Sequence, residues 1–301
     1  MTVAEAYSVC RRIAKREAKN FYYAFRVLPR HKSDAMCAVY AFMRRADDIA
    51  DDETMTVEER RVVMQRWVED WRAARQSRVC GDPVFVALND TQKTFAIPDA
   101  LLEELVEGTT MDLAPRPESQ GAVQTYADFD ELYRYCYLVA SVVGLVCIRI
   151  FGYSDPRAEK FAEETGIAFQ FTNILRDVKE DVERGRVYLP LDMMAAHGVS
   201  VERVKELAAG AAMTDSDRAL LEELVAKAEG YYGSANELLP LIDADSRAAL
   251  WVLAMIYYDL LVRIRAKKCD VFSTRVRVPS AGKLVILARG AVMALRNRRN
   301  A

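Results

Sequence analysis

Histidine and paired cysteine are both scarce in this sequence, which removes several kinds of metal and redox site. There are only 2 histidines among 301 residues, too few for a His-rich metal site. The 6 cysteines stand singly, with no CxxC pair and no zinc-type spacing. We therefore interpret them as small buried apolar residues of a protein from a reducing compartment.

Glycine, proline and net charge are low as well. The 13 glycines and 9 prolines, set against abundant Ala, Leu, Glu and Arg, favour helix over sheet. A net charge of −2 lacks the basic excess of a nucleic-acid-binding protein, so we expect no nucleic acid partner. No signal-peptide-like apolar stretch opens the chain, and the longest uncharged run, 135–148, is shorter than the roughly 20 residues that span a bilayer. We expect a cytoplasmic monomer, and leave open a peripheral contact with the inner face of the membrane.

Helical periodicity extends along the whole chain, and no stretch shows sustained two-residue alternation. The clearest break is 114–124 (APRPESQGAVQ), whose Pro, Ser and Gly content predicts a surface loop. Because no linker rich in Gly and Ser divides the chain, we predict one all-α domain over residues 1–301. Its expected helices are 3–25, 33–51, 57–75, 82–95, 98–109, 128–150, 155–183, 191–196, 200–210, 214–239, 243–268 and 283–296.

The last expected helix combines apolar and basic residues. Leu284, Leu287 and Val292 are interspersed with Arg289 and Arg296. We expect a surface helix packed on its own domain, and a helix that faces a membrane is the alternative.

An acidic string ends the second expected helix. At about 3.6 residues per turn, Tyr40, Arg44, Asp47 and Asp51 fall along one stripe. Carboxylates one turn apart repel each other, and the repulsion grows where apolar neighbours such as Ile49 exclude water. The stripe therefore predicts a positively charged partner between the carboxylates.

A second polar stripe lies in the helix expected over 155–183. Gln170, Asn173, Asp177 and Asp181 recur at steps of three and four residues, with apolar residues between them. Two such helices facing each other across a bundle would form a site for hard cations. For either stripe alone, the alternative is a solvated helix face with Arg–Asp pairs.

The donors in both stripes are carboxylate and amide oxygens, which favour Mg²⁺ or Mn²⁺ over zinc. Magnesium keeps several waters and binds through a few carboxylates plus substrate phosphate, so the stripes predict a phosphorylated substrate. The cationic side chains close to them in sequence, which we expect to contact phosphate oxygens, are Lys19, Arg44, Arg176 and Arg186.

Several motifs follow one another along the chain: NFYYA (20–24), YAFMRRADDIAD (40–51), YCYLVA (135–140), QFTNILRDVKEDVERGRVYLP (170–190) and RVRV (275–278). In this order they resemble the squalene/phytoene synthase family, and the 170–190 segment resembles its most specific signature. The resemblance covers nearly the whole chain.

The resemblance implies a single-domain isoprenoid synthase bundle with a central apolar cavity between the two acidic helices. The implied metal ligands are Asp47, Asp48, Asp51, Asn173, Asp177 and Asp181. The implied diphosphate contacts are Lys19, Arg44, Arg176 and Arg275. The implied lining of the reaction site is Phe21, Tyr40, Tyr135, Gln170 and Tyr257; core packing is the alternative for each aromatic residue alone. The family commonly has Ser where this chain has Asn20, from which we expect altered hydrogen bonding to diphosphate without loss of activity.

The resemblance also implies a magnesium-dependent prenyltransferase that joins two isoprenyl diphosphates head to head. NFYYAFRVLP and RVRVP look closest to bacterial presqualene diphosphate and squalene synthases. We therefore expect two farnesyl diphosphates to condense through a cyclopropyl intermediate to presqualene diphosphate, and leave continuation to squalene and use of NADPH open. The alternative is a 15-cis-phytoene synthase that condenses two geranylgeranyl diphosphates. Outside this class stand a terpene cyclase and a non-catalytic prenyl-diphosphate-binding protein.

Overall fold

The computed structural model describes residues 1–76, 81–113 and 123–299, without the side chains of 19, 20, 112 and 297–299. In this part of the chain the regular structure is helical, which confirms the all-α prediction. The elements are α1 (Val3–Glu17), α2 (Lys19–Phe25), α3 (Arg30–Ala50), α4 (Val57–Gln76), α5 (Pro83–Thr94), α6 (Asp99–Thr110), the 3₁₀ turn η1 (Met111–Leu113), α7 (Phe129–Cys136), the π-helical turn η3 (Tyr137–Ser141), α8 (Val142–Phe151), α9 (Arg157–Glu183), α10 (Leu191–Ala196), α11 (Val201–Ala208), α12 (Asp215–Leu238), α13 (Arg247–Ala266) and α14 (Ser280–Arg299).

The helix expected over 3–25 is two helices, which corrects that prediction. The break falls at Ala18, a residue type with no local tendency to end a helix. Tertiary packing imposes it, since α1 packs on α3 and α5 whereas α2 packs on α13. Most of the loop predicted over 114–124 lies outside the described residues.

Side-chain caps fix several helix starts. Thr2 and Glu5 form a capping box at α1, and Thr214 and Asp217 form another at α12. Asp82 accepts hydrogen bonds from the first free N–H groups of α5. Each such cap contributes about 1 kcal/mol, so the larger part of helix stability must come from packing of the buried faces.

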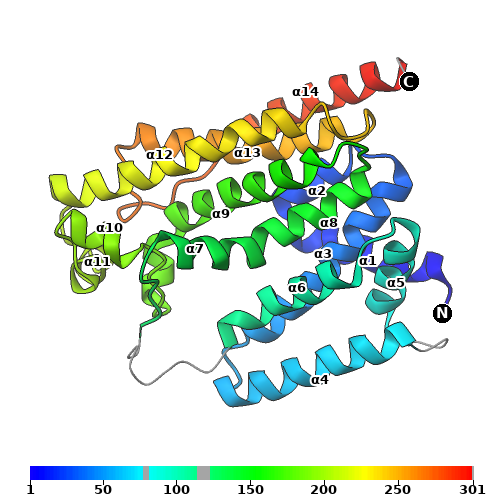
Figure 1. The fold of residues 1–301 in the computed structure, drawn as a ribbon, viewed down its shortest axis with the longest axis horizontal. Helices are drawn as coiled ribbons and strands as arrows, with labels where there is room; N and C mark the ends of the chain where they lie inside the picture. The colour runs from blue at the N-terminus through cyan, green and yellow to red at the C-terminus, as the bar shows by residue number, and fades with distance from the viewer. Residues whose placement is uncertain (77–80, 114–122, 300–301) are drawn as a thin grey trace.

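The long helix α9 runs through the middle of the molecule (Figure 1). It packs against α12 and α13 on one side and against α8 and η3 on another. Helix α4 forms one outer edge, at the bottom of Figure 1, and α14 forms the opposite edge at the top. The order of the layers places α3, α8, α9 and α13 around one interior.

Helices α7, η3 and α8 form one continuous helical run, Phe129–Phe151. The run is long and apolar enough to cross a membrane by length and composition, but half of it is buried inside the protein. A Cβ atom at Gly108 of α6 would lie 2.4 Å from the Leu138 carbonyl oxygen, and one at Gly166 of α9 would lie 2.6 Å from the Ser141 Cα. The run is therefore a core helix that two neighbours approach closely at its π-helical turn.

A buried lysine ties three distant parts of the chain together. Lys32 at the start of α3 is 6% exposed. Its ammonium group donates to the Phe151 carbonyl oxygen at 2.8 Å, to Asp245 at 2.7 Å and to Ser246 at 3.1 Å. The first turn of α3 is thereby fixed to the end of α8 and the start of α13, which holds one end of the interior closed.

Candidate active site

An apolar cavity of about 250 Å³ lies between α2, α3, the η3–α8 run, α9 and α13. Arg44, Asp47 and Asn173 line it at one end. From Asp47 back along α3 to Met36, the cavity follows the helix for about 16 Å. The lining at the far end is apolar and consists of Phe25, Met36, Phe151, Leu238 and Leu250. The predicted central cavity between the two acidic helices is thus present.

Four aromatic rings meet beside the polar end of the cavity. Phe21 lies 6.5 Å from Tyr40 and 6.0 Å from Tyr257, measured between ring centroids. Phe169 stacks on Tyr257 at 4.5 Å. The sequence analysis named three of these four residues as lining and missed Phe169. The only indication of Phe169 in the sequence is that it directly precedes Gln170, the first residue of the second stripe.

Burial keeps the phenols of this group in their neutral form. It raises the pKa of Tyr40 to about 12, a shift that Arg44 opposes and Asp47 supports. Burial also raises the pKa of Tyr257, against the opposing effects of Arg176 and a hydrogen bond from Asn173. Both rings therefore present neutral, electron-rich faces near the cavity at neutral pH.

The first acidic stripe spreads over two neighbouring spaces. Asp47 lines both the apolar cavity and a separate polar hollow of about 180 Å³, and Asp51 lines the hollow. Asp48 lines neither space, but it pairs at 2.6 Å with Arg44, which lines the apolar cavity. Asp52 accepts hydrogen bonds from the backbone and hydroxyl of Thr54 at the surface, as expected of a solvated charge. The structure thus brings Asp47 and Asp51 together, and leaves Asp48 with its cation one turn away.

The second stripe carries an amide oxygen without a partner. Asn173 Oδ1 is buried and accepts no hydrogen bond, while its Nδ2 lies 3.4 Å from Gln170 Oε1. Both side chains line the cavity. Across it, the Nε of Arg44 is a buried donor that also lacks a partner. A buried acceptor and a buried donor left unsatisfied at one end of a cavity are costly unless a ligand completes them.

The next acid of the stripe is paired with cations. Asp177 accepts from Arg176 at 2.8 Å and from Arg275 at 2.7 Å, and Arg275 also contacts Glu180 at 2.7 Å. Arg275 reaches α9 from the segment between α13 and α14. The structure therefore brings one predicted metal ligand into contact with two predicted diphosphate contacts. The side chain of Lys19, predicted as a third, lies outside the described residues.

The polar hollow is lined by basic residues of the loop after α9. Arg184 and Arg186 face Asp47 and Asp51 across it, with Tyr135 also in its wall. Arg186 further lines a small space beside Asp181. The loop therefore lies beside both acidic stripes. The sequence named Arg186 only as a candidate contact for phosphate oxygens, and it did not single out Arg184.

Tyr135 lies outside the apolar cavity, in contrast to the predicted lining. It borders the polar hollow, where its hydroxyl donates to that of Tyr188 at 3.1 Å. The two rings stack at 5.0 Å, and Tyr126 packs on both. Val139 lines both spaces and stands between the hollow and the cavity. Tyr135 is thus placed near Asp47 and away from the other predicted aromatic residues.

The oxygen donors fit a hard divalent cation only together with a ligand. Among the described residues, no group of three or more His, Cys, Asp or Glu side chains converges as a metal site. Asp47, Asp51 and the orphaned oxygen of Asn173 nevertheless supply the donor type that magnesium prefers. Magnesium sites of this kind are completed by water and substrate phosphate, which matches so open an arrangement.

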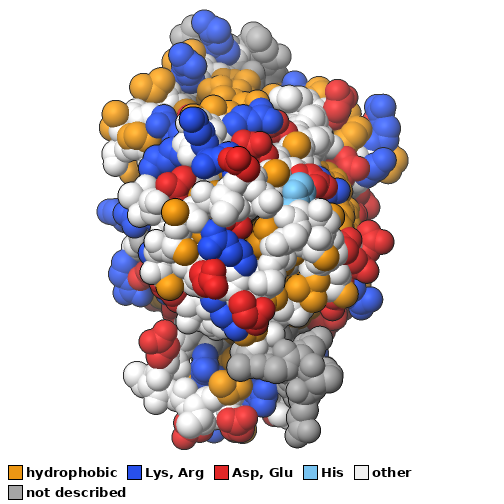
Figure 2. All heavy atoms as spheres, turned by 90° about the vertical axis from the view of Figure 1, so that its left-hand side faces the viewer, with side chains coloured by type: hydrophobic (Ala, Val, Ile, Leu, Met, Phe, Trp, Pro, Cys, Tyr) orange, Lys and Arg blue, Asp and Glu red, His pale blue; other side chains and the backbone are white. Residues whose placement is uncertain are grey.

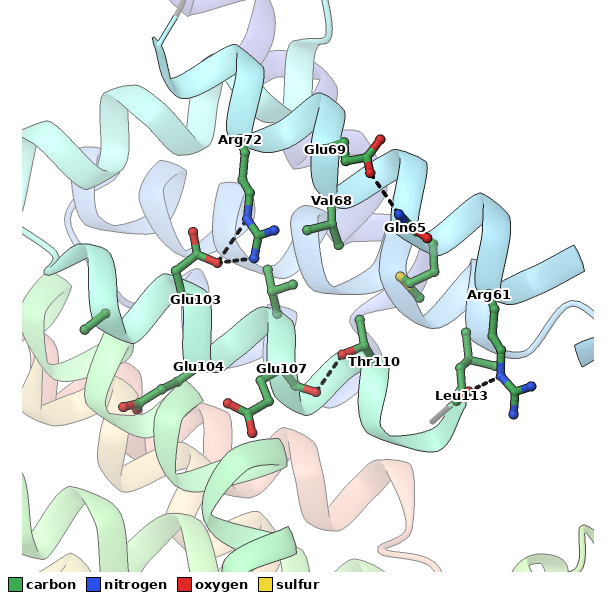
Figure 3. Close-up of a pocket in the computed structure, with 13 residues that line it drawn as sticks. Arg61, Gln65, Val68, Glu69, Arg72, Glu103, Glu104, Glu107, Thr110 and Leu113 are labelled. Carbon is green, nitrogen blue, oxygen red and sulfur yellow. Dashed lines mark hydrogen bonds and ion pairs between the residues drawn. The ribbon is translucent and has the colours of Figure 1, made fainter. Parts of the chain in front are cut away.

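A hollow that is larger than the apolar cavity lies elsewhere, between α4 and α6 (Figure 3). It measures about 830 Å³ and contains none of the predicted site residues. Arg72 and Glu103 pair across it at 2.7 Å, and Glu69 and Glu107 add further charge to its walls. Its charged, open walls are those of a solvated groove between two helices, so size alone does not identify the site.

Comparison with known proteins gives matches over nearly the whole chain. A family model described as squalene/phytoene synthase matches residues 14–281. The phytoene synthase of Mycobacterium tuberculosis is 35% identical over 293 residues, which cover 95% of this chain and 90% of that protein. The 15-cis-phytoene synthase of Synechocystis is 32% identical over 301 residues, which cover 95% and 84%. A crystal structure of a dehydrosqualene synthase in complex with ligand superposes with a TM-score of 0.83 at 29% identity over 98% of both chains.

Proposed function

Because the chain belongs to the squalene/phytoene synthase family, we propose that it joins two geranylgeranyl diphosphates head to head to form 15-cis-phytoene. Members of this family are prenyltransferases. The relatives at 35% and 32% identity carry the name phytoene synthase, which favours this product over the presqualene diphosphate expected from the sequence. The farnesyl reading is the competing one, and the dehydrosqualene synthase at 29% identity supports it.

The proposal is carried by one observation: a single cavity has charged and amide side chains at one end and apolar side chains along the rest of its length. Asp47 and Asn173 lie at the end where a diphosphate would sit, and the lining beyond them is apolar for about 16 Å. A prenyl chain fits such a space because its tail is apolar throughout and its only charge is at one end. Burial of the tail would also exclude water from the reacting carbon.

We assign Mg²⁺ or Mn²⁺ to the oxygens of Asp47, Asp51 and Asn173, with Asp48, Asp177 and Asp181 as further ligands. When bound, the ion would neutralise charge that grows on the departing diphosphate. Arg176 and Arg275 would exchange Asp177 for phosphate oxygens, a partner that Arg binds equally well through its planar fork. Lys19 and Arg44 are assigned to the same diphosphate.

The polar hollow offers a place for the second diphosphate. Arg184 and Arg186 would bind its oxygens. Asp47 faces both the cavity and the hollow, and Asp51 faces the hollow. Departure of the first diphosphate leaves an allylic cation, which the double bond of the second chain attacks, and proton loss closes a cyclopropane. The rings of Phe21, Tyr40 and Tyr257, which cluster beside the polar end of the cavity, would stabilise such a cation through their faces.

The phytoene end point needs no reductant. Two geranylgeranyl chains lose two diphosphates and two protons in all, and the electrons balance without a hydride donor. We therefore propose that the reaction is independent of NADPH. Tyr135, paired with Tyr188 beside the hollow, is assigned to hold the second substrate. A cytoplasmic location and a monomeric state stay predictions.

The decisive experiment is incubation of the purified protein with each diphosphate separately. Farnesyl and geranylgeranyl diphosphate are each supplied with and without Mg²⁺ and NADPH, and the extracted lipids are identified by mass spectrometry. We expect 15-cis-phytoene from geranylgeranyl diphosphate with Mg²⁺, and no change on adding NADPH. Presqualene diphosphate or squalene from farnesyl diphosphate, with geranylgeranyl diphosphate inert, would replace this proposal by the farnesyl reading. Absence of product from both would support a non-catalytic binding protein.

A further inference from the structure

Helix α14 has an apolar face turned to solvent. Its packed side is formed by Ile286 and Ala294, each less than 10% exposed, with Gly290 between them. A Cβ atom at Gly290 would lie 2.3 Å from the Val252 side chain, so this side fits tightly on α13. The opposite side would be polar in an ordinary surface helix. Here it carries large apolar side chains: Leu284 (59% exposed), Val285 (52%), Val292 (49%) and Leu295 (61%).

Exposed apolar side chains are concentrated on the last two helices of the described chain. Of the eleven large hydrophobic side chains exposed in the described residues, six belong to α13 and α14. The two on α13 are Tyr258 and Val262, one turn apart. Figure 2 shows hydrophobic and basic side chains together at the upper end of the molecule, the edge that α14 forms in Figure 1. Four large exposed apolar side chains on the single helix α14 differ from the singly scattered apolar residues that are normal for a protein surface.

The charge on α14 has one sign. The helix contains no Asp or Glu, and its basic residues are Lys283, Arg289, Arg296, Arg298 and Arg299. Val285, Arg289, Val292 and Arg296 follow one another along one stripe, so apolar and cationic side chains alternate on the exposed side. Ala288 and Met293 complete a shallow hollow of about 480 Å³ between the two arginines.

We propose that α14 is a docking surface for an anionic lipid bilayer, with its apolar face among the acyl chains and its arginines on headgroup phosphates. A basic helix with an apolar face that lies in the membrane interface has this distribution of side chains. Charge complementarity selects this occupant over a second copy of the chain. Two α14 faces placed together would bring Arg289 and Arg296 against like charges, with no acid on either helix to compensate.

The docking surface is one helix away from the cavity. Ile286 of α14 packs in one cluster with Val252, Leu253 and Ile256 of α13. Leu253 in turn lines the apolar cavity. If the proposed function holds, a water-insoluble hydrocarbon forms directly behind the wall that faces the lipid. The membrane contact itself rests on α14 alone and does not depend on that function.

The apolar part of the surface is tested by sedimentation with vesicles of phosphatidylcholine mixed with phosphatidylglycerol, using the full chain. Val285→Ser with Val292→Ser should lower the bound fraction, with the partition coefficient falling roughly tenfold. The matched control is Val57→Ser with Val62→Ser, the same change at exposed positions of α4, and it should bind as the wild type does. Circular dichroism melting shows that both variants remain folded.

The charged part is tested in the same assay. Arg289→Gln with Arg296→Gln should lower partitioning roughly twentyfold, and the wild type should lose a similar factor in high salt. Arg66→Gln with Lys93→Gln, which removes two exposed charges from other helices, is the control. Vesicles of phosphatidylcholine alone should retain little protein.

Several outcomes would overturn the proposal. These are wild-type protein that does not sediment with anionic vesicles, equal binding to uncharged vesicles, and α14 variants that bind as their controls do. Sedimentation velocity adds another: a dimer that the Val285→Ser, Val292→Ser variant dissociates would assign the face to a second copy. A chain that binds vesicles but turns over neither diphosphate would refute the proposed function and leave this surface standing.

Discussion

The oxygen of one amide is the strongest single-residue sign of a ligand in this protein. Asn173 Oδ1 is buried without a hydrogen-bond donor at the polar end of the cavity. Leaving such an acceptor unpaired costs about 1–3 kcal/mol. A bound cation would satisfy it, and this cost is then recovered as affinity for the ligand.

Asn173→Ala is expected to lower kcat/KM for the diphosphate substrate by about 100-fold and to raise the magnesium concentration needed for half-maximal rate. The reason is loss of one oxygen donor with little loss of packing. Steady-state rates at a series of Mg²⁺ concentrations measure both effects. Asn236→Ala, the same change at an exposed position of α12, is the control. An unchanged magnesium response in Asn173→Ala would remove this residue from the ligand set.

A buried carboxylate far from the cavity gives a prediction about stability and pH. Asp217 is 2% exposed and accepts from Arg203 at 2.8 Å and from the N–H of Thr214 at 2.8 Å. Burial acts to raise the pKa of Asp217, but these hydrogen bonds outweigh it and hold the pKa below its usual value. The contribution to stability is therefore present above the unfolded-state pKa of about 3.9, and is lost as pH falls through the lower folded-state value.

Asp217→Asn should accordingly lower the free energy of unfolding at neutral pH by about 1–3 kcal/mol. The difference from wild type should start to shrink below about pH 3.9, where the unfolded chain takes up the proton, and should be lost below the lower folded-state pKa, where the wild-type carboxylate is protonated as well. Urea unfolding at a series of pH values measures it. A difference that stays constant over the whole series would mean that the charge of Asp217 does not stabilise the fold.

At the residue scale, periodicity was sufficient to place the acids and insufficient to place their partners. The steps from Asp47 to Asp51 and from Asn173 to Asp177 follow from the helical repeat alone. The pairing of Asp177 with Arg275 depends on a segment that returns to α9 from across the chain. Local spacing contains no information about such a contact.

At the scale of elements, glycine sets how closely helices approach the cavity. A Cβ atom at Gly166 of α9 would lie 2.6 Å from the Ser141 Cα and 2.9 Å from the Ala140 carbonyl oxygen. These are backbone atoms of the π-helical turn, so they cannot move aside as a side chain would. Gly166 and Ala140 also line the cavity.

Gly166→Ala should therefore destabilise the protein by about 2 kcal/mol, because α9 and η3 must separate to accept the methyl group. Gly230→Ala on α12 is the matched control, since nothing lies within 4 Å of its Cβ position. Alanine there should stabilise the helix by about 0.5–1 kcal/mol. If both variants had higher urea midpoints than the wild type, the close approach at Gly166 would impose no stability cost on alanine.

Helix positions were largely predictable because the chain is amphipathic almost throughout and its breaks carry Pro, Gly or capping residues. Helix α10 has the predicted bounds, 191–196. The two features that sequence did not indicate, the break at Ala18 and the π-helical turn at Tyr137–Ser141, contain no helix-breaking residue. Both arise where neighbouring helices dictate the backbone, so propensity could not reveal them.

At the scale of the whole molecule, the site depends on helices that are distant in sequence. Residues from α2, α3, α8, α9 and α13 line one cavity, and the Lys32 cluster closes the same bundle at the start of α3. Sequence pattern predicted the class of fold and the polar end of this cavity. The depth of the cavity depends on which apolar side chains from different helices contact one another at its far end. Helical periodicity does not predict such contacts between helices.

Cavity depth should decide which prenyl chain the enzyme accepts. Cys147 of α8 lines the cavity about 12 Å along the helix from Val139, which borders the polar hollow. A larger side chain at this position would fill space that the last isoprene unit of a C20 chain needs and a C15 chain leaves empty. Cys147→Phe should therefore lower kcat/KM for geranylgeranyl diphosphate about tenfold more than for farnesyl diphosphate. Cys147→Ala should leave the ratio unchanged, and an equal fall for both substrates in the Phe variant would show that depth at this point does not select chain length.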